Sequence, residues 1–315
     1  MKNLRTYYKG TSLNNLEKFS FEKEDLMGYQ NIIYEKDGYV VRIILNRPEK
    51  MNALSLALQH DLIAGMTEAE EDDEVKVIIL KGSGRCFASG YDLSEVGFMY
   101  GMKEPKPGEK MRVKPSQRVR LQKDRFMFYE VYNHVLLCPK LTIAQVHGYC
   151  IGGGLTLVQH CDFIIASEDC KFGHVEERMG FAGTTLSPML ILRVGLTRAL
   201  DLCITGKMID AKKAYEIGLI NRVVPLDQLD SEVEEFARAL AQYPRDGIRF
   251  GKVKRHMVYD MMGITSEFAP AYAMHSFQTN ITFEPDELNF FKERRDKGVQ
   301  KAAHLKQDFY KALDK

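Results

Sequence analysis

An uncharged stretch from Leu141 to Val158 limits most strongly what this chain can fold into. It reads LTIAQVHGYCIGGGLTLV, contains no Asp, Glu, Lys or Arg, and is nearly long enough to span a membrane. Three consecutive glycines, a histidine and a glutamine in its middle argue against a membrane helix. The same letters fit a buried strand that runs through a tight glycine turn into a buried helix.

Strand patterns come before and after this stretch. Two apolar runs flank Lys36-Asp37-Gly38, which is typical of a hairpin because Asp-Gly tolerates the positive φ of a tight turn. The segment from Val75 to Leu80 is almost wholly apolar, as expected of a strand buried on both faces. Further short strands are expected over residues 162–166 and 170–172.

Helical patterns lie between these strands and dominate the last third of the chain. Ser55 is expected to cap one helix, and the helix after the three glycines is expected to run to Cys161. From Ser187 onward helical patterns prevail. Strands crossed by helices and followed by a helical tail predict an α/β fold. We expect an N-terminal extension over residues 1–30, a core over 31–226 and a C-terminal helical region over 227–315.

Composition argues against several classes of protein. The 315 residues contain 44 Lys and Arg against 43 Asp and Glu, so no overall basic charge favours nucleic acid. The N-terminus lacks the apolar segment of a secretory signal. The six cysteines form no CxxC pair, which argues against a zinc site or a disulfide scaffold and favours a cytoplasmic location. We therefore expect no nucleic-acid partner and no membrane partner.

Two glycine-containing turns each follow an apolar strand: residues 88–92 (ASGYD) and residues 148–154 (GYCIGGG). Backbone N–H groups at such turns and helix starts carry partial positive charge, so they can hold an anion or a developing oxyanion. Taken alone, each one is better explained as a tight structural turn. The GxGxxG spacing of dinucleotide sites is absent.

Five segments in order make the sequence resemble the crotonase (enoyl-CoA hydratase/isomerase) superfamily over residues 32–226. They are LNRPEKMNALS (45–55), CFASGYDL (86–93), AQVHGYCIGGGLTL (144–157), CDFIIASEDCKFGHVEERMG (161–180) and TGKMIDAKKAYEIGLINRVVP (205–225). The resemblance implies a core of repeated ββα units and C-terminal helices that make trimer contacts, with trimers often pairing into hexamers. It also implies an acyl-CoA thioester substrate, with no metal and no redox cofactor.

The resemblance assigns roles to particular positions. Two backbone N–H groups, of Tyr91 and Gly153, are implied as the oxyanion hole that holds the thioester oxygen. Positions that line the CoA and acyl path in the family match a larger set here: Lys50, Ala53, Ser89, Tyr91, Asp92, Leu93, Gly153, Val175 and Met179. A lysine-rich and arginine-rich segment, residues 103–125, is either a further contact for the CoA phosphates or a solvated loop and helix face.

Of the two catalytic carboxylates of typical hydratases, this sequence retains one. The first position holds Thr156, and the second holds Glu176. A threonine hydroxyl cannot act as a base near pH 7, but it can orient a water molecule. We expect Glu176 to act as the acid/base and Thr156 to help place water. Neighbouring His174, Glu177 and Arg178 are expected to form a solvated or interface edge.

Several reactions fit a single glutamate. Hydration of a 2,3-double bond is favoured, and double-bond isomerisation by Glu176 alone is the alternative. Hydroxycinnamoyl-CoA hydratase-lyases also pair a small hydroxyl residue with this glutamate, but they place serine and tryptophan where this chain has Val175 and Met179. Tyr272 is in the right neighbourhood for the tyrosine that recognises a phenol in those enzymes. A non-catalytic crotonase-fold binding protein is the remote alternative.

Overall fold

The computed structural model describes residues 28–95, 116–278 and 281–314. Its centre is a six-stranded sheet in the order β1-β2-β3-β4-β6-β9, in which only β1 and β2 pair antiparallel. The strands are β1 (Ile32–Asp37), β2 (Val40–Leu45), β3 (Val77–Gly82), β4 (Leu141–Val146), β6 (Phe163–Ser167) and β9 (Arg222–Val224). A three-stranded sheet joins β5 (Tyr149–Ile151), β7 (Lys171–Gly173) and β8 (Ile209–Asp210). The predicted α/β fold is confirmed.

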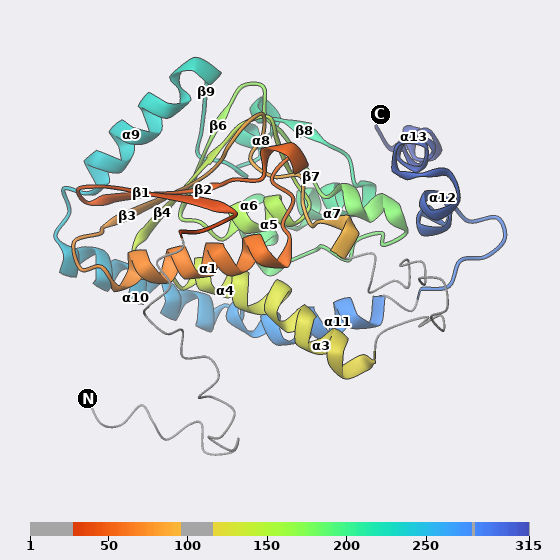
Figure 1. The fold of residues 1–315 in the computed structure, drawn as a ribbon, viewed down its shortest axis with the longest axis horizontal. Coiled ribbons are helices and arrows are strands. Elements are labelled where there is room, and N and C mark those ends of the chain that lie inside the picture. The colour runs from red at the N-terminus through yellow and green to blue at the C-terminus, as the bar shows by residue number, and fades with distance from the viewer. Residues whose placement is uncertain (1–27, 96–115, 279–280, 315) are drawn as a thin grey trace.

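Helices cover both faces of the large sheet. Alternate residues of β3 point to opposite sides: Ile78 and Leu80 pack in the cluster that contains α1 (Leu56–Glu71), and Val77 and Ile79 pack against α9 (Leu229–Leu240). Figure 1 shows α1 and α9 on opposite sides of the sheet. Burial on both faces explains why this strand is an uninterrupted apolar run rather than an alternating one.

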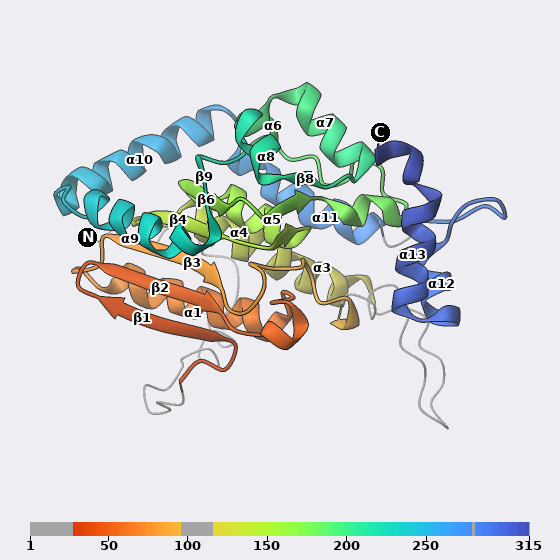
Figure 2. The same cartoon turned by 90° about the horizontal axis from the view of Figure 1, so that it is seen from above.

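The remaining helices follow the chain toward its C-terminus. They are α3 (Gln117–Arg125), α4 (Val131–Leu136), α5 (Gly153–Gln159), α6 (Pro188–Val194), α7 (Leu196–Thr205), α8 (Ala211–Glu216), α10 (Arg245–Met261), α11 (Phe268–Gln278), α12 (Phe290–Lys297) and α13 (Val299–Phe309). A π-helical turn, Phe126–Glu130, connects α3 to α4. Helices α12 and α13 stand side by side at the end of the molecule away from the start of α10 (Figure 2).

Local signals predict several elements well. Gly38 turns the hairpin with a φ of +59°, and the Ser55 hydroxyl accepts a bond from the Leu58 N–H at the start of α1. Other predictions were wrong in detail. The strand expected from Val75 begins at Val77, and the helix expected to reach Cys161 ends at Gln159. The expected glycine turn contains the strand β5, and two strands, β8 and β9, interrupt the helices expected after Ser187.

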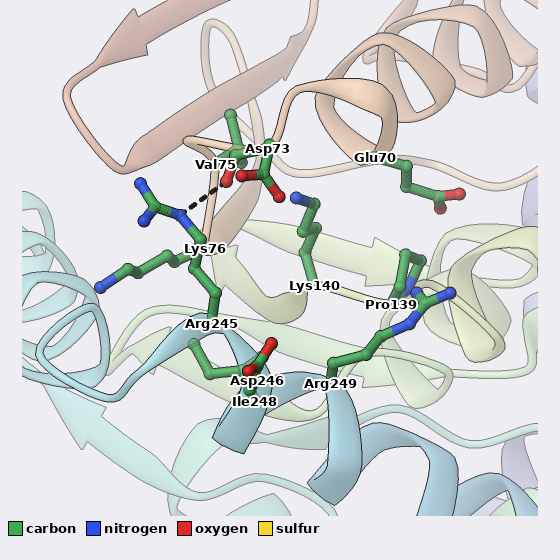
Figure 3. Close-up of a pocket in the computed structure, with 10 residues that line it drawn as sticks. All are labelled: Glu70, Asp73, Val75, Lys76, Pro139, Lys140, Arg245, Asp246, Ile248 and Arg249. Atoms are coloured by element: carbon green, nitrogen blue, oxygen red, sulfur yellow. Dashed lines mark hydrogen bonds between the residues drawn. The ribbon is translucent and has the colours of Figure 1, made fainter.

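A surface hollow marks where α10 joins the sheet. It has a volume of about 260 Å³ and lies at the amino ends of β3 and β4 (Figure 3). Three of its four cations are bound to backbone carbonyls: Lys76 to Ala241 and Tyr243, Lys140 to Asp72, and Arg245 to Asp73. These bonds fasten the start of α10 to the loop before β3, at the opposite strand ends from the two glycine turns.

A buried ion pair fixes the middle of α10. Lys252 donates to both carboxylate oxygens of Asp162, just before β6, and both side chains are almost fully buried. The same carboxylate accepts the Thr142 N–H at the start of β4.

Within the described ranges, no helix is long and apolar enough to cross a membrane. Of the expected N-terminal extension, only residues 28–30 lie inside the described part.

His160, at the end of α5, contacts both α5 and α4. Its Nδ1 lies 2.7 Å from the Thr156 carbonyl oxygen, and its ring stacks on Tyr132 of α4 at 5.5 Å. Burial lowers the pKa of His160 from 6.5 to about 4. The imidazole therefore stays neutral in the folded chain under conditions in which the unfolded chain takes up a proton.

We expect acid to destabilise the fold through this group. Its contribution is fully present above pH 6.5 and is lost as the pH falls toward 4, at a cost of roughly 3 kcal/mol in the free energy of unfolding. Denaturant unfolding at pH 7, 5.5 and 4 should show a shallower loss for His160→Gln than for the parent. The exposed His304→Gln serves as control. Equal pH slopes in parent and His160→Gln would contradict this account.

Candidate active site

The two glycine-containing turns meet at the carboxyl ends of neighbouring parallel strands. β3 leads to residues 88–92 and β4 leads to residues 148–154. Backbone hydrogen bonds join the turns: the Ala88 N–H donates to Tyr149 over 3.0 Å, and the Ile151 N–H donates to Ala88 over 3.2 Å. The turns are therefore held as one unit by the backbone itself.

The glycines allow this approach because a side chain would not fit. A Cβ on Gly154 would lie 2.8 Å from the Cβ of Ala88. A Cβ on Gly90, which has a φ of +90°, would lie 3.2 Å from the Ile151 oxygen and 3.5 Å from the Gly153 nitrogen. The start of α5 thus sits directly beside the first turn.

The Tyr91 and Gly153 N–H groups have no hydrogen-bond partner among the described residues. Leu54 forms backbone hydrogen bonds with the two neighbours of Tyr91. Its N–H donates to the Gly90 oxygen, and its carbonyl accepts the Asp92 N–H, so it forms no bond with the Tyr91 N–H. Gly153 is the first residue of α5, where an N–H has no partner within the helix. The structure therefore places the two turns side by side, each with one N–H that has no described partner, and the oxyanion hole itself stays a prediction.

Glu176 lies on a 3₁₀ turn, Val175–Met179, and faces the same place. A Cβ on Gly152 would lie 3.1 Å from Glu176 Oε2, so the carboxylate reaches the residue before α5. Oε1 lies 3.3 Å from His174 Nδ1, whereas Oε2 is buried and has no hydrogen-bond partner in the described part of the chain. One carboxylate oxygen is thus available beside Gly152, the residue before α5.

Thr156 lies one helical turn further along α5. Its hydroxyl is 3.4 Å from the Gly152 oxygen, to which it donates within the helix, and the side chain is partly exposed. Gly152 is therefore bordered by the carboxylate of Glu176 and by the hydroxyl of Thr156. A hydroxyl satisfied by its own helix retains acceptor lone pairs for a water molecule.

The prediction of a solvated edge at His174, Glu177 and Arg178 was wrong, because all three side chains are buried. Glu177 accepts the backbone N–H groups of Gly183, Thr184 and Thr185, which would otherwise be unpaired. Arg178 donates to the Thr205 oxygen and pairs with Asp314 after α13. The burial of both charges is compensated, for Glu177 by the nearby loop at residues 183–185 and for Arg178 by Asp314 near the end of the chain.

The predicted lining residues before α1 gather around Arg47. Its guanidinium donates to the Ala53 oxygen and pairs with Asp92 at 3.0 Å. The Ser89 N–H donates to the Met51 oxygen, and Lys50 is exposed at the end of a 3₁₀ turn, Pro48–Lys50. Backbone and salt-bridge contacts therefore hold this loop against the turn that carries Tyr91.

The C-terminal helices touch the other predicted lining residues. Arg294 of α12 donates to the Leu93 oxygen over 3.3 Å, and Lys306 of α13 donates to the Val175 oxygen over 3.2 Å. Met179 packs with Phe290 and Ala302 of the same helices. Both cations thus bind carbonyls that lie within two residues of Tyr91 or Glu176.

Sequence reasoning missed Lys306, Arg294 and Tyr132. Burial lowers the pKa of Lys306, and the negative charge of Glu176 acts in the opposite direction. No spacing or motif around these residues distinguishes them from ordinary helix positions. Of the basic segment, residues 103–115 lie outside the described part. Arg120 is buried and binds the Ser276 oxygen of α11, so it joins two helices.

Comparisons with known proteins agree with this geometry. The model of the family described as "Enoyl-CoA hydratase/isomerase" matches residues 35–301. A probable enoyl-CoA hydratase of Rhizobium meliloti is 36% identical over 69% of this chain and 77% of its own length. A probable enoyl-CoA hydratase of Mycobacterium bovis is 32% identical over 72% and 81%, respectively.

Solved structures give the same result. An enoyl-CoA hydratase/isomerase from Xanthobacter autotrophicus Py2 superposes with a TM-score of 0.76 at 29% identity, covering 89% of this chain and 98% of that one. A probable enoyl-CoA hydratase from Mycobacterium smegmatis gives 0.68 at 32% identity, covering 78% and 93%. The chain therefore belongs to the enoyl-CoA hydratase/isomerase family.

The contact between Gly152 and Glu176 predicts that a methyl side chain at position 152 destabilises the fold. Gly152→Ala forces a side chain into a backbone with φ of +55° and against the carboxylate, so we expect it to lower the free energy of unfolding by about 1–3 kcal/mol. Gly251→Ala on α10 is the matched control, since nothing lies within 4 Å and the position is helical. That control should instead gain about 0.5–1 kcal/mol. Denaturant unfolding checks both, and equal effects would contradict this reading.

Proposed function

We propose that this protein hydrates the 2,3-double bond of an enoyl-CoA thioester. The observation that supports this most is the unpaired Glu176 Oε2 beside the free N–H groups of Tyr91 and Gly153. Donors fixed in the backbone stabilise negative charge that develops on a thioester oxygen, because they need no reorganisation during the reaction. A carboxylate next to them can exchange protons with the neighbouring carbons or with water.

The proposed steps use a single carboxylate. The thioester oxygen accepts the two N–H groups, which makes C3 electrophilic. Glu176 takes a proton from a water molecule placed with the help of Thr156, and the water oxygen bonds to C3. The resulting enolate collapses as Glu176 returns a proton to C2, so the elements of water are added and nothing is oxidised. These steps need no metal ion and no redox cofactor.

Removing the acid/base should separate catalysis from binding. We expect Glu176→Gln to lower kcat for hydration of crotonyl-CoA at least ~100-fold, which is the usual contribution of a positioned acid or base. The Kd for the thioester should stay within a few-fold, because the amide keeps the shape of the side chain. Glu168→Gln, at an exposed position in the connection between β6 and β7, is the control. Near-normal turnover by Glu176→Gln would exclude the proposed role.

Isomerisation is the second candidate, because Thr156 stands where a two-carboxylate hydratase has its other acid. In that reaction Glu176 alone would carry a proton between C2 and C4. A hydroxycinnamoyl-CoA substrate also stays a prediction. Tyr272 of α11 lies edge-on to Tyr129, with ring centroids 6.4 Å apart.

Thr156→Val distinguishes the two candidates. The variant keeps the shape of the side chain and removes the hydroxyl that places water. We expect hydration of crotonyl-CoA to fall about tenfold, corresponding to one lost hydrogen bond in the transition state, whereas isomerisation of 3-hexenoyl-CoA should change little. Both rates are measured on the same preparation by chromatography of the products. Hydration unaffected by the loss of the hydroxyl would contradict the water-placing role.

An oligomer is proposed from the surface of α10. An apolar stripe at helical spacing is exposed along it: Phe250, Val253, Met257 and Met261. Contiguous apolar surface of this kind favours association, and we propose a second copy of this chain as its partner, in a trimer or a hexamer.

The six free, buried cysteines suit a reducing compartment, so we propose a cytoplasmic location. The proposed reaction requires neither nucleic acid nor a membrane.

A further inference from the structure

Two tyrosine hydroxyls connect the residues that carry the free N–H groups. The ring of Tyr91 lies against Gly153, where a Cβ would come within 3.0 Å of Cε2 and Cζ. The Tyr91 hydroxyl forms a short hydrogen bond with the hydroxyl of Tyr132. The Tyr132 hydroxyl in turn lies 3.3 Å from the carbonyl oxygen of Gly153, to which it donates. The side chain of one donor residue is therefore linked to the carbonyl of the other.

The direction of the hydrogen bonds follows from the number of protons. A hydroxyl has one proton to donate, and the Tyr132 proton points to the Gly153 carbonyl. The Tyr91 hydroxyl must therefore be the donor in its bond with Tyr132. The chain runs from Tyr91 through Tyr132 to Gly153, and each proton in it is used once. Burial, more than any neighbouring charge, raises the pKa of Tyr91 and that of Tyr132, so both hydroxyls stay protonated near neutral pH.

Packing holds both rings in place. Tyr132 is buried on α4, immediately after the π-helical turn, and stacks on His160 at the end of α5. Phe128 of the π-helical turn packs on the other ring, that of Tyr91, with centroids 5.0 Å apart. Tyr132 therefore contacts α5 at its start, through the Gly153 carbonyl, and at its end, through His160.

We propose that Tyr91 and Tyr132 are positioning residues that set the separation and orientation of the Tyr91 and Gly153 N–H groups. This inference rests on the proposed function, since it concerns how the thioester oxygen is held. The two donors come from segments more than sixty residues apart, and a small displacement of either peptide weakens its bond to a developing oxyanion. The hydroxyl chain ties the two peptides to each other through side chains, in addition to the backbone bonds at Ala88.

Kinetics of phenylalanine variants give the first test. Tyr132→Phe leaves the Tyr91 hydroxyl without its acceptor and removes the side-chain bond to the Gly153 carbonyl, and we expect kcat for crotonyl-CoA to fall about tenfold with KM within about twofold. Tyr91→Phe should do the same. The double variant should be no slower than the slower single variant, because both hydroxyls belong to one chain. Tyr29→Phe, which removes a tyrosine hydrogen bond to Glu68 far from the site, is the matched control.

A spectroscopic test separates positioning from a purely structural role. Cinnamoyl-CoA bound to Glu176→Gln should absorb at longer wavelength than free cinnamoyl-CoA, because the two N–H groups polarise its carbonyl. Adding Tyr132→Phe to that variant should remove at least half of the shift, whereas adding Tyr29→Phe should leave it unchanged. A full shift together with normal kcat in the tyrosine variants overturns the positioning role but leaves the proposed function intact. A parent protein that binds no thioester overturns both.

Discussion

The close contact between the turns after β3 and β4 is the constraint on which the rest of this structure depends. Ala88 is bonded to Tyr149 and Ile151, and Gly154 approaches it so closely that no side chain could intervene. This contact places the start of α5 beside the turn of Tyr91. Parallel neighbouring strands end at the same edge of a sheet, so the fold delivers both turns to one place. The proposed oxyanion hole is therefore a consequence of backbone packing.

Charges near the two turns are paired with the loop at residues 183–185 and with the C-terminal helices. Glu177 accepts three N–H groups of the loop at residues 183–185, which fixes the turn that carries Glu176. Lys306 and Arg294 bind carbonyls next to the two proposed catalytic segments. The acid/base thus depends on the C-terminal helices for its surroundings, although its own position is set by the core. Changes in α12 or α13 should reach the site through these contacts.

Local patterns in the sequence predict the parts of the fold that depend on local chemistry. Asp37-Gly38 turns the hairpin and Ser55 caps its helix, because both effects need only neighbouring residues. Strand β5 was missed, since three residues between glycines are too few to show a period. The family motifs indicate Glu176 and Gly153, whose contacts lie within the matching segments.

The burial of charged side chains could not be predicted from the sequence. His174, Glu177 and Arg178 look like a solvated group because adjacent titratable residues are usually exposed. Arg178 pairs with Asp314, which is distant in the chain, and Glu177 accepts N–H groups from the loop at residues 183–185, so these partners become visible only in the folded structure. Tyr132 and Lys306 escaped notice for the same reason. A tyrosine or a lysine on a helix has no signature until its neighbour across the fold is known.

Product analysis in deuterated water tests the central claim most directly. Crotonyl-, 3-hexenoyl- and feruloyl-CoA would be incubated with the protein in deuterated water and analysed by mass spectrometry. We expect a 2,3-unsaturated thioester to gain the elements of water and one non-exchangeable deuterium at C2. Thioesters recovered with unchanged composition, with or without a shifted double bond, would contradict hydration as the activity.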